Sequence, residues 1–334
     1  MIFSIMRVMA AIVLMILCNC AIVSCVLQEQ DESLIVDLRE KEKEMVPLAD
    51  PFIMLYDGIY YAYGTTGNKD FFVYISSDLK YWEKYETPVL TANDSFGGSR
   101  FWAPEVYYDE DLKKFQMYYS SEMYLCVATS DSPLGPFVQD EKKTILNNYC
   151  GIDPTLFVEN GKKYLCFSMI TDRNYMCITP INSVNAVINN NVDILFSTDQ
   201  RWEGKRTVEG GSIIKVGKKY VMTYSGNDFS SPEYGIGVAF ADNIMGPWTK
   251  YAKNPIIQYP SYKSGVLGGT GHNSIFTDKD GKLRIVFHAH SSIGYSGGRY
   301  MYIGSLNTHD KEPYISIKND IFAARLVSAE SEMP

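Results

Sequence analysis

Residues 152–170 read IDPTLFVENGKKYLCFSMI and contain a pattern that recurs along the chain. Asp153 and Pro154 open the segment, two runs of apolar and aromatic residues follow, and Asn160-Gly161 separates the two runs. Asn-Gly between such runs is a strong signal for the tight turn of a β-hairpin. The segment therefore predicts two antiparallel strands, with a polar residue at the start of the first.

Four further segments repeat this pattern of a short opening motif, an aromatic strand, a turn and a second aromatic strand. They are ADPFIMLYDGIYYAYGTT at 49–66, WAPEVYYDEDLKKFQMYYSS at 102–121, EGGSIIKVGKKYVMTYSG at 209–226 and GHNSIFTDKDGKLRIVFHAH at 271–290. Outer segments with a polar turn and then an aromatic residue repeat as well: SSDLKYWEK at 76–84, SDSPLGPFVQ at 130–139 and ADNIMGPWTK at 241–250. The chain therefore contains five similar units.

The spacing of the five units predicts the architecture. The opening residues Asp50, Trp102, Asp153, Glu209 and His272 are 52, 51, 56 and 63 residues apart. Such periods, with about four strands in each, are typical of propeller blades. A two-sheet sandwich would leave the five equivalent openings unexplained, and no stretch shows sustained helical periodicity. We predict an all-β protein whose residues 47–334 form a single-domain, five-bladed β-propeller.

The N-terminus is a separate segment. Residues 1–24 contain Arg7 and then a long apolar run, the layout of a secretory signal peptide. The run ends in Ile22-Val23-Ser24-Cys25, which resembles a bacterial lipobox and predicts lipidation of Cys25. Residues 25–46 are rich in charge and predict a solvated tether. We therefore expect an exported bacterial lipoprotein of the periplasm or outer-membrane surface, bound to the membrane through its lipid alone. The alternative is that residues 1–24 form an uncleaved signal anchor.

Composition and cysteine use narrow the function classes. The 334 residues include 31 Lys and Arg against 39 Asp and Glu, a net charge of −8, so nucleic acid is not an expected partner. Neutral polymers such as polysaccharides are compatible with this charge. Four cysteines follow Cys25, at 126, 150, 166 and 177, and their irregular spacing matches no metal or disulfide pattern. Cys126 and Cys166 lie in apolar runs and are predicted to be core residues.

Three of the five opening residues are carboxylic acids, namely Asp50, Asp153 and Glu209. Each precedes a Pro or Gly and then an apolar strand, so each acid alone could be a turn cap. The innermost strands of a propeller line its central channel, so equivalent residues on different blades converge at one mouth. Three carboxylates in one pocket cannot all stay ionised easily, and the pKa of at least one rises. An acid and a base with separated pKa values suit the hydrolysis of glycosidic bonds.

Together these motifs resemble glycoside hydrolase family 43. The resemblance is carried by Ala49-Asp50-Pro51, Trp102-Ala103-Pro104-Glu105, Ile152-Asp153-Pro154, Glu209-Gly210 and Gly271-His272, in order and at blade spacing. It implies that Asp50 is the general base, that Glu209 is the general acid, and that Asp153 modulates the pKa of the acid and orients it. Glu105 is a fourth candidate acid, but its place in WAPE favours a role in the blade scaffold.

The resemblance also implies residues that contact the substrate. Trp102 is expected to be an aromatic platform for a sugar ring, although a core position is its alternative. Arg299 matches an arginine that reaches a sugar hydroxyl, and His272 matches a histidine at the propeller centre. His272 would approach a hydrated cation, often calcium, through water, although hydrolysis by two carboxylates requires no cofactor. His288 and His290 alternate along a strand and are expected to be polar strand residues near the axis.

The function that this resemblance implies is that of an inverting glycoside hydrolase acting on pentose-containing polysaccharides or oligosaccharides of the plant cell wall. Inversion places acid and base about 6.5–9.5 Å apart, with water between base and sugar. The segment GHNS, followed by HAHSS and Arg299, resembles the arabinanase pattern of this family and favours an arabinose-directed enzyme. Within that group we expect an α-L-arabinofuranosidase. A β-xylosidase and an endo-arabinanase of the same family remain alternatives, as does a surface lipoprotein that binds glycans without catalysis. The presence of all three acids argues against that last reading, and sequence does not decide between exo and endo action.

Overall fold

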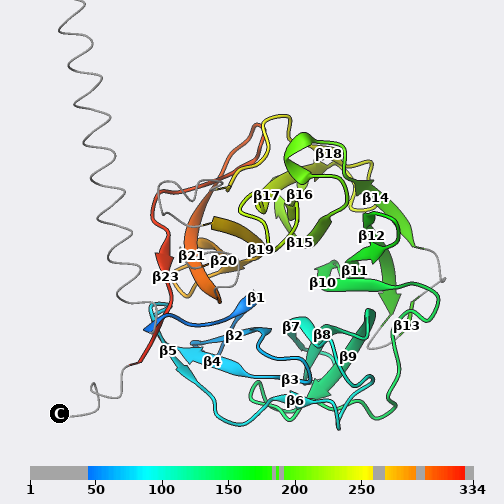
Figure 1. Ribbon diagram of the computed structural model, residues 1–334, viewed down its shortest axis with the longest axis vertical. Coiled ribbons are helices and arrows are strands. Elements are labelled where there is room, and N and C mark those ends of the chain that lie inside the picture. The colour runs from blue at the N-terminus through cyan, green and yellow to red at the C-terminus, as the bar shows by residue number, and fades with distance from the viewer. Residues whose placement is uncertain (1–43, 183–185, 188–191, 259–267, 291–297, 328–334) are drawn as a thin grey trace, which may run out of the picture.

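The computed structural model describes residues 44–182, 186–187, 192–258, 268–290 and 298–327. Five of the six sheets in this part of the chain are arranged around a central axis, which confirms the predicted five-bladed β-propeller (Figure 1). The predicted signal peptide at 1–24, the lipidation site Cys25 and most of the predicted tether lie outside the described residues. No helix among the described residues is long and apolar enough to cross a membrane.

Each blade is an antiparallel sheet whose first strand lies nearest the axis. Blade I contains β1 (Ala49–Tyr56), β2 (Ile59–Thr65), β4 (Val73–Ser76) and β5 (Tyr81–Lys84). Blade II contains β7 (Trp102–Asp109), β8 (Lys114–Ser121) and β9 (Tyr124–Ser130). Blade III contains β10 (Gly151–Glu159), β11 (Lys162–Ile170), β12 (Asn174–Asn182), β13 (Ala186–Val187) and β14 (Asp193–Ser197). Blade IV contains β15 (Val208–Val216), β16 (Lys219–Gly226), β17 (Gly235–Ala241) and β18 (Thr249–Lys250). Blade V contains β19 (Gly268–Thr277), β20 (Leu283–His290), β21 (Arg299–Thr308), β22 (Ile315–Ile317) and β23 (Phe322–Ala323).

Short elements complete the description of the chain. β3 (Asp70–Phe71) pairs with β6 (Leu90–Thr91) as a small ribbon between blades I and II, and a single 3-10 turn, η2 (Arg201–Glu203), precedes blade IV. The five predicted hairpins coincide with β1–β2, β7–β8, β10–β11, β15–β16 and β19–β20. The turn residues Asp57-Gly58 and Asn160-Gly161 have positive φ angles at both positions, as tight hairpin turns require.

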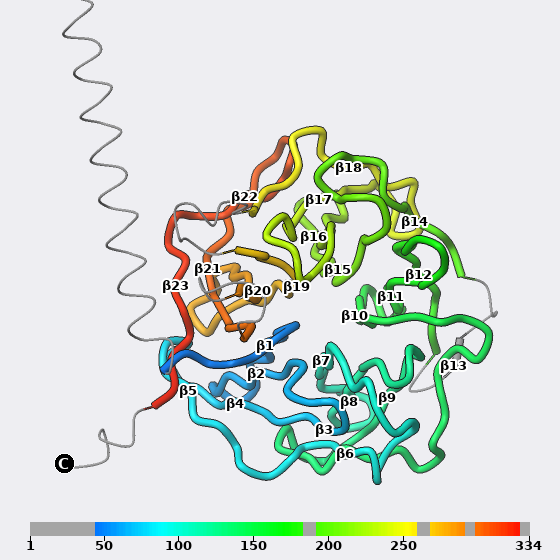
Figure 2. The backbone as a smooth tube through the Cα atoms, viewed as in Figure 1, coloured from blue at the N-terminus to red at the C-terminus, as the bar shows by residue number. Residues whose placement is uncertain are grey.

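Both ends of the described chain join blade V to blade I (Figure 2). β23 pairs with β21 of blade V, and β24 (Arg325–Leu326) pairs in parallel with β5 of blade I. The N–H of Val46 donates to the carbonyl of Ala324 at 3.0 Å, and the carbonyl of Val46 accepts from Met301 at 3.0 Å. Met45 and Val46 are buried, so the propeller begins two residues before the boundary predicted at residue 47. The N-terminal segment and the C-terminal strands thus close the ring together.

Aromatic side chains fill the space between neighbouring blades. Phe101 stacks on Tyr119 at 5.8 Å between ring centroids, and Phe71 meets both rings edge-on within the cluster that joins blades I and II. Cys126 lies in the same cluster and Cys166 in the cluster between blades III and IV, which confirms their predicted core positions. Cys126, Cys150, Cys166 and Cys177 are all free thiols.

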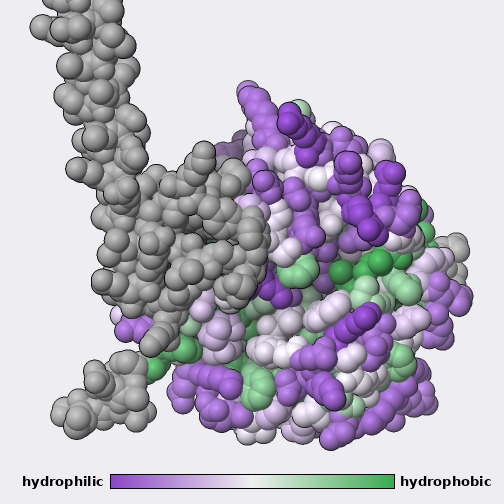
Figure 3. Space-filling view, in the orientation of Figure 1, coloured by the Kyte–Doolittle hydropathy of each residue, from purple (hydrophilic) through white to green (hydrophobic). Residues whose placement is uncertain are grey.

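The face seen in Figure 3 is mostly hydrophilic, with apolar residues gathered over β10 to β12.

Every innermost strand bends near its start, at the same place in each blade. The pairing register shifts there, and one residue adopts a positive φ angle; the five residues are Asp50, Ala103, Asp153, Gly210 and His272. Trp102 and Glu209, taken from sequence as the equivalent residues of blades II and IV, therefore lie one residue before the bend. The structural repeat aligns Ala103 and Gly210, and not Trp102 and Glu209, with Asp50, Asp153 and His272, because all five inner strands carry the same β-bulge.

Candidate active site

Asp50, Asp153 and Glu209 come from the inner strands of blades I, III and IV, and the structure brings them together at the axis. Asp50 Oδ1 lies 3.4 Å and Asp153 Oδ2 lies 3.7 Å from the same atom, Nδ1 of His272. The two carboxylate oxygens are therefore separated by no more than the sum of these distances. Glu209 interacts electrostatically with both aspartates. The prediction that the three acids share one pocket agrees with this arrangement.

Asp50 is surrounded by groups that favour its ionised form. Its Oδ1 accepts from Nη1 of Arg299 at 2.8 Å, and its Oδ2 accepts from the hydroxyl of Thr65 at 2.6 Å. Its N–H donates to Nδ1 of His288 at 3.1 Å, which fixes the backbone at the bend. Burial alone would raise the pKa of Asp50, but the permanent charge of Arg299 and the neighbouring groups hold the pKa well below its usual value. Asp50 is therefore a carboxylate at neutral pH.

Glu209 has the opposite electrostatic environment. Burial raises its pKa to about 7, and the negative charge of Asp50 adds to the effect. Its Oε1 accepts from the hydroxyl of Tyr234 at 2.8 Å, a bond that lowers the pKa and partly offsets the burial. Glu209 as a whole is half-buried. It is a carboxyl group that carries a proton through much of the neutral range.

Asp153 touches the backbone next to Glu209. Its Oδ2 accepts from the N–H of Gly210 at 3.2 Å, and its own N–H donates to the hydroxyl of Ser120 at 3.0 Å. Burial and then the negative charges of Glu209 and Asp50 raise the pKa of Asp153 well above its usual value. The bond to Gly210 supports an orienting role. The charges of Asp153 and Glu209 disfavour each other's ionised form, so the role of Asp153 in modulating the pKa of Glu209 stays a prediction.

Glu105 is a fourth buried carboxyl group near the axis. Burial raises its pKa to about 7, and its Oε2 accepts a hydrogen bond from the hydroxyl of Tyr107. That hydroxyl also contacts Thr155 at 3.2 Å and accepts from the N–H of Leu156 at 3.1 Å, both on β10. These contacts tie blade II to blade III, and they support the interpretation of Glu105 as part of the scaffold.

The other residues singled out from sequence lie around the acids. Arg299 begins β21 and binds Asp50, while Trp102 begins β7 and is half-buried. His288 is fully buried next to Asp50, and His290 contacts the carbonyl of Phe229 at 2.8 Å. Both histidines are therefore polar strand residues close to the axis, as expected.

His272 occupies the bend of blade V, where its N–H donates to the hydroxyl of Ser225 at 2.7 Å. Burial lowers the pKa of His272, so its contacts with the aspartates are those of a neutral imidazole. In the described part of the chain, no group of three or more His, Cys, Asp or Glu side chains is arranged to hold a metal ion directly. A cation reached through water needs no such group, and that arrangement stays a prediction.

Sequence reasoning missed two hydroxyl groups that touch the acids. Thr65 on β2 binds Asp50, and Tyr234, just before β17, binds Glu209. A signal for the first was present, because the second strand of each hairpin carries a polar residue at or near its end, opposite the bend. These residues are Thr65, Ser120, Ser168, Ser225 and His288. Four of these side chains accept the N–H of the bent residue in the next blade, and Ser168 donates to the Val208 carbonyl instead. Tyr234 lies outside the repeated motif.

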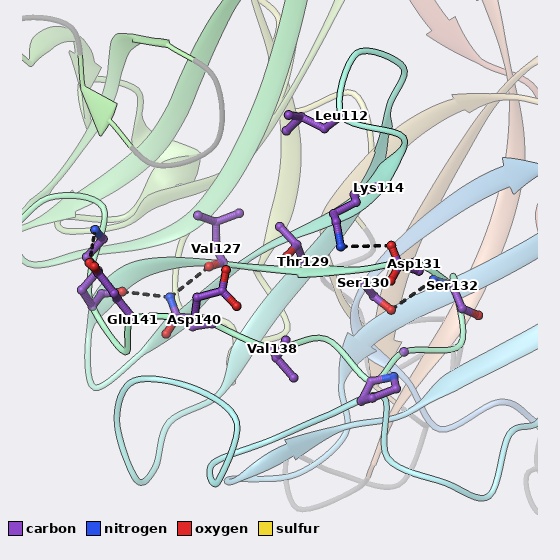
Figure 4. Close-up of a pocket in the computed structure, with 14 residues that line it drawn as sticks. Leu112, Lys114, Val127, Thr129, Ser130, Asp131, Ser132, Val138, Asp140 and Glu141 are labelled. Atoms are coloured by element: carbon purple, nitrogen blue, oxygen red, sulfur yellow. Dashed lines mark hydrogen bonds and ion pairs between the residues drawn. The ribbon is translucent and has the colours of Figure 1, made fainter.

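A groove of about 690 Å³ opens at the outer strands of blade II (Figure 4). It is lined by an ion pair between Lys114 and Asp131 and by apolar residues such as Val127 and Val138. It contains none of the three acids and no aromatic ring. The axial cluster is therefore the candidate active site.

Comparison with known proteins gives consistent matches. The model of "Glycosyl hydrolases family 43" matches residues 46–312. A crystal structure of endo-1,4-beta-xylanase from Bacteroides thetaiotaomicron is 37% identical, with a TM-score of 0.79 over 85% of this chain and 98% of that one. The extracellular exo-alpha-(1->5)-L-arabinofuranosidase of Streptomyces avermitilis is 25% identical over 75% of this chain and 56% of its own length. The arabinoxylan arabinofuranohydrolase of Paenibacillus polymyxa is 24% identical over 72% of this chain and 44% of its own length. The chain spans about half the length of these two curated relatives.

Proposed function

The chain belongs to glycosyl hydrolase family 43 and is a glycoside hydrolase, and we propose that it cleaves pentose-containing plant polysaccharides or oligosaccharides with inversion of configuration. The observation that carries this proposal is the opposite charge state of two neighbouring carboxyl groups. The pKa of Asp50 lies well below its usual value, whereas that of Glu209 is raised to about 7. One carboxylate and one protonated carboxyl group are therefore present together below neutral pH, as acid–base hydrolysis requires.

The proposed reaction is a single displacement. Glu209 gives its proton to the glycosidic oxygen as the bond to the anomeric carbon breaks. Asp50 removes a proton from a water molecule, whose oxygen attacks the anomeric carbon from the opposite side. The proton received by Asp50 then leaves to solvent, and Glu209 takes one up. Each turnover consumes one water molecule and leaves both carboxyl groups in their starting states.

The neighbouring residues have proposed roles in positioning. Asp153 orients Glu209 through the N–H of Gly210. One guanidinium nitrogen of Arg299 donates to Asp50, and the remaining N–H groups of the guanidinium are proposed to bind a sugar hydroxyl. We place Trp102 as an aromatic platform and His272 as a substrate contact at the mouth. The predicted central cation would be held by His272 through water, where it would contribute positive charge beside the acids; no step of the proposed reaction passes through it.

An α-L-arabinofuranosidase is the proposed activity. It is supported by the sequence pattern around His272, His288 and Arg299, and by the names of the Streptomyces and Paenibacillus relatives. An enzyme acting on xylan or xylosides is the second candidate, because the Bacteroides structure that is 37% identical is named an endo-1,4-beta-xylanase. Endo-arabinanase activity is the third, since a Bacillus subtilis relative carries that name.

Two measurements test this proposal. Release of sugar from arabinan, arabinoxylan, xylan, aryl α-L-arabinofuranosides and aryl β-D-xylosides identifies the substrate, with Asp50→Asn as the inactive control. Proton NMR of the first product, recorded before mutarotation, gives the stereochemistry. A first product with retained configuration would show that a carboxylate attacks the sugar, and the roles of Asp50 and Glu209 would be wrong. Binding of a polysaccharide without any release of sugar would favour the glycan-binding alternative.

Export is proposed as well. The Streptomyces and Bacillus relatives are named extracellular enzymes, and the N-terminal sequence resembles a lipoprotein signal peptide. Such an enzyme would meet plant polysaccharides outside the cytoplasm while anchored through a lipid on Cys25.

A further inference from the structure

Tyr234 is a fully buried tyrosine that lies between the proposed acid and the proposed base. Its hydroxyl donates to Oε1 of Glu209 at 2.8 Å, and its ring stacks on His288 with centroids 5.8 Å apart and planes 16° apart. We propose that Tyr234 is a positioning residue that occupies Oε1 of Glu209, so that the proton for the leaving group is carried on Oε2. This inference rests on the proposed general-acid role of Glu209.

The hydrogen bond from Tyr234 determines which oxygen of Glu209 carries the proton. The carbonyl oxygen of a protonated carboxyl group is a better acceptor than its hydroxyl oxygen. With Oε1 accepting from Tyr234, the hydrogen of a protonated Glu209 therefore lies on Oε2. After the proton has left, the same hydroxyl binds the new carboxylate, and a bond to an ionised acceptor is stronger than one to a neutral acceptor. Tyr234 therefore both selects the oxygen that transfers the proton and stabilises the conjugate base.

The ring of Tyr234 is held in place by the residues packed against it. His288, on which it stacks, accepts the backbone N–H of Asp50 through Nδ1. The ring also lies against Gly271, where the Cβ of any other residue would overlap it. The phenol is thus confined by two adjacent strands of blade V, β19 at Gly271 and β20 at His288. A change that moves the ring moves the hydroxyl away from Glu209.

The charges around this pair fix the sign of the expected pH effect. The charged and titratable groups that face Glu209 and Tyr234 from the packed elements are Asp50, Asp153, Asp228, His288 and Arg299. The negative groups and burial raise the pKa of Glu209, whereas Arg299 and the Tyr234 hydroxyl lower it. Removing the hydroxyl therefore raises the pKa of Glu209, and the alkaline limb of kcat/KM moves to higher pH. A purely structural role would leave this limb in place.

The first experiment compares Tyr234→Phe with Tyr224→Phe. Tyr224 is a matched control, because it is also buried and donates at 2.7 Å to a buried carboxylate, Glu203, away from the three acids. For Tyr234→Phe we expect a loss of kcat of roughly tenfold or more on oligosaccharides, a smaller loss on aryl glycosides with a good leaving group, and an alkaline limb about 1 pH unit higher. Tyr224→Phe should lower the melting temperature and change neither the limb nor the dependence on the leaving group.

The second variant, Gly271→Ala, keeps the hydroxyl but displaces the ring, and should reproduce the selective loss on poor leaving groups. Glu209→Gln tests the general-acid role of Glu209 separately from the positioning role of Tyr234. If Glu209→Gln loses equally on good and poor leaving groups, Glu209 is not the acid and the proposed function fails. If Glu209→Gln behaves as an acid variant while Tyr234→Phe matches Tyr224→Phe in limb and selectivity, the positioning role of Tyr234 is overturned. A fall in melting temperature in Tyr234→Phe with no shift of the limb counts against it equally.

Discussion

The hydroxyl of Thr65 connects the proposed base to the next blade, and its removal is a direct test of the environment of Asp50. It donates to Asp50 Oδ2 at 2.6 Å and accepts from the N–H of Ala103 at 3.0 Å. Thr65→Val removes both bonds while nearly preserving the shape of the side chain. Since the first bond favours the ionised carboxylate, its loss must raise the pKa of Asp50.

The size of the shift follows from the strength of that bond. A hydrogen bond to a charged group contributes about 1.5–3 kcal/mol, and one pKa unit corresponds to about 1.36 kcal/mol. Thr65 is half-buried, so we expect the lower end of the range, an increase of about 1 unit in the pKa of Asp50. The unpaired N–H of Ala103 should lower the free energy of unfolding by about 1–3 kcal/mol as well.

The assay is the pH dependence of kcat/KM on an aryl pentoside, because this ratio reports the pKa values of the free enzyme. The acid limb of Thr65→Val should move to higher pH by about 1 unit, while the rate at neutral pH changes little because Asp50 stays ionised there. Thr65→Ser keeps the hydroxyl and should keep the parent limb. An acid limb that stays in place in Thr65→Val, or that moves to lower pH, would refute the assignment of Asp50 as the base held ionised by its neighbours.

Three further changes test other parts of the molecule. Glu209→Gln should reduce hydrolysis of oligosaccharides far more than hydrolysis of activated aryl glycosides, whose leaving group needs no proton; paired initial rates measure this, and equal losses would contradict the acid assignment. Lys250→Met removes the ion pair at 2.6 Å from the buried side chain of Glu203, so the free energy of unfolding, measured in urea, should fall by about 3–5 kcal/mol. The control Lys113→Met removes an exposed ion pair and should change it by less than about 1 kcal/mol. Cys25→Ala should release the protein from membranes on fractionation; continued retention would support a signal anchor instead.

The repeated hairpins made the fold predictable from sequence. Asp57-Gly58 and Asn160-Gly161 define turns by their own chemistry, and the 50-residue spacing needs no knowledge of distant contacts. The pairing of neighbouring strands follows from these local signals. The blade boundary at Met45 was not visible, because its burial depends on contacts with residues near the C-terminus such as Arg325.

The site was predictable in its acids and not in their partners. Asp50, Asp153 and Glu209 are carboxylic acids that precede Pro or Gly at the openings of repeated units, so residue type and period together single them out. The partners depend on which side chains meet across blades. Tyr234 reaches Glu209 from a segment outside the repeat, and the bulge that places Gly210 rather than Glu209 at the bend has no separate sequence signal.

The bends that create the site also bind the ring of blades together. Asp50, Ala103, Asp153 and His272 have positive φ angles, a conformation that costs of the order of 1–3 kcal/mol for a residue with a side chain. Each of these four residues donates its N–H to a side chain from the second strand of the preceding blade. A strained backbone persists only where its surroundings over-determine it, so each bend depends on correct docking of its neighbour. Asp50 therefore reaches its position only when blade V docks on blade I, and Asp153 only when blade II docks on blade III. Loss of contact between blades V and I through His288 would misplace Asp50 first.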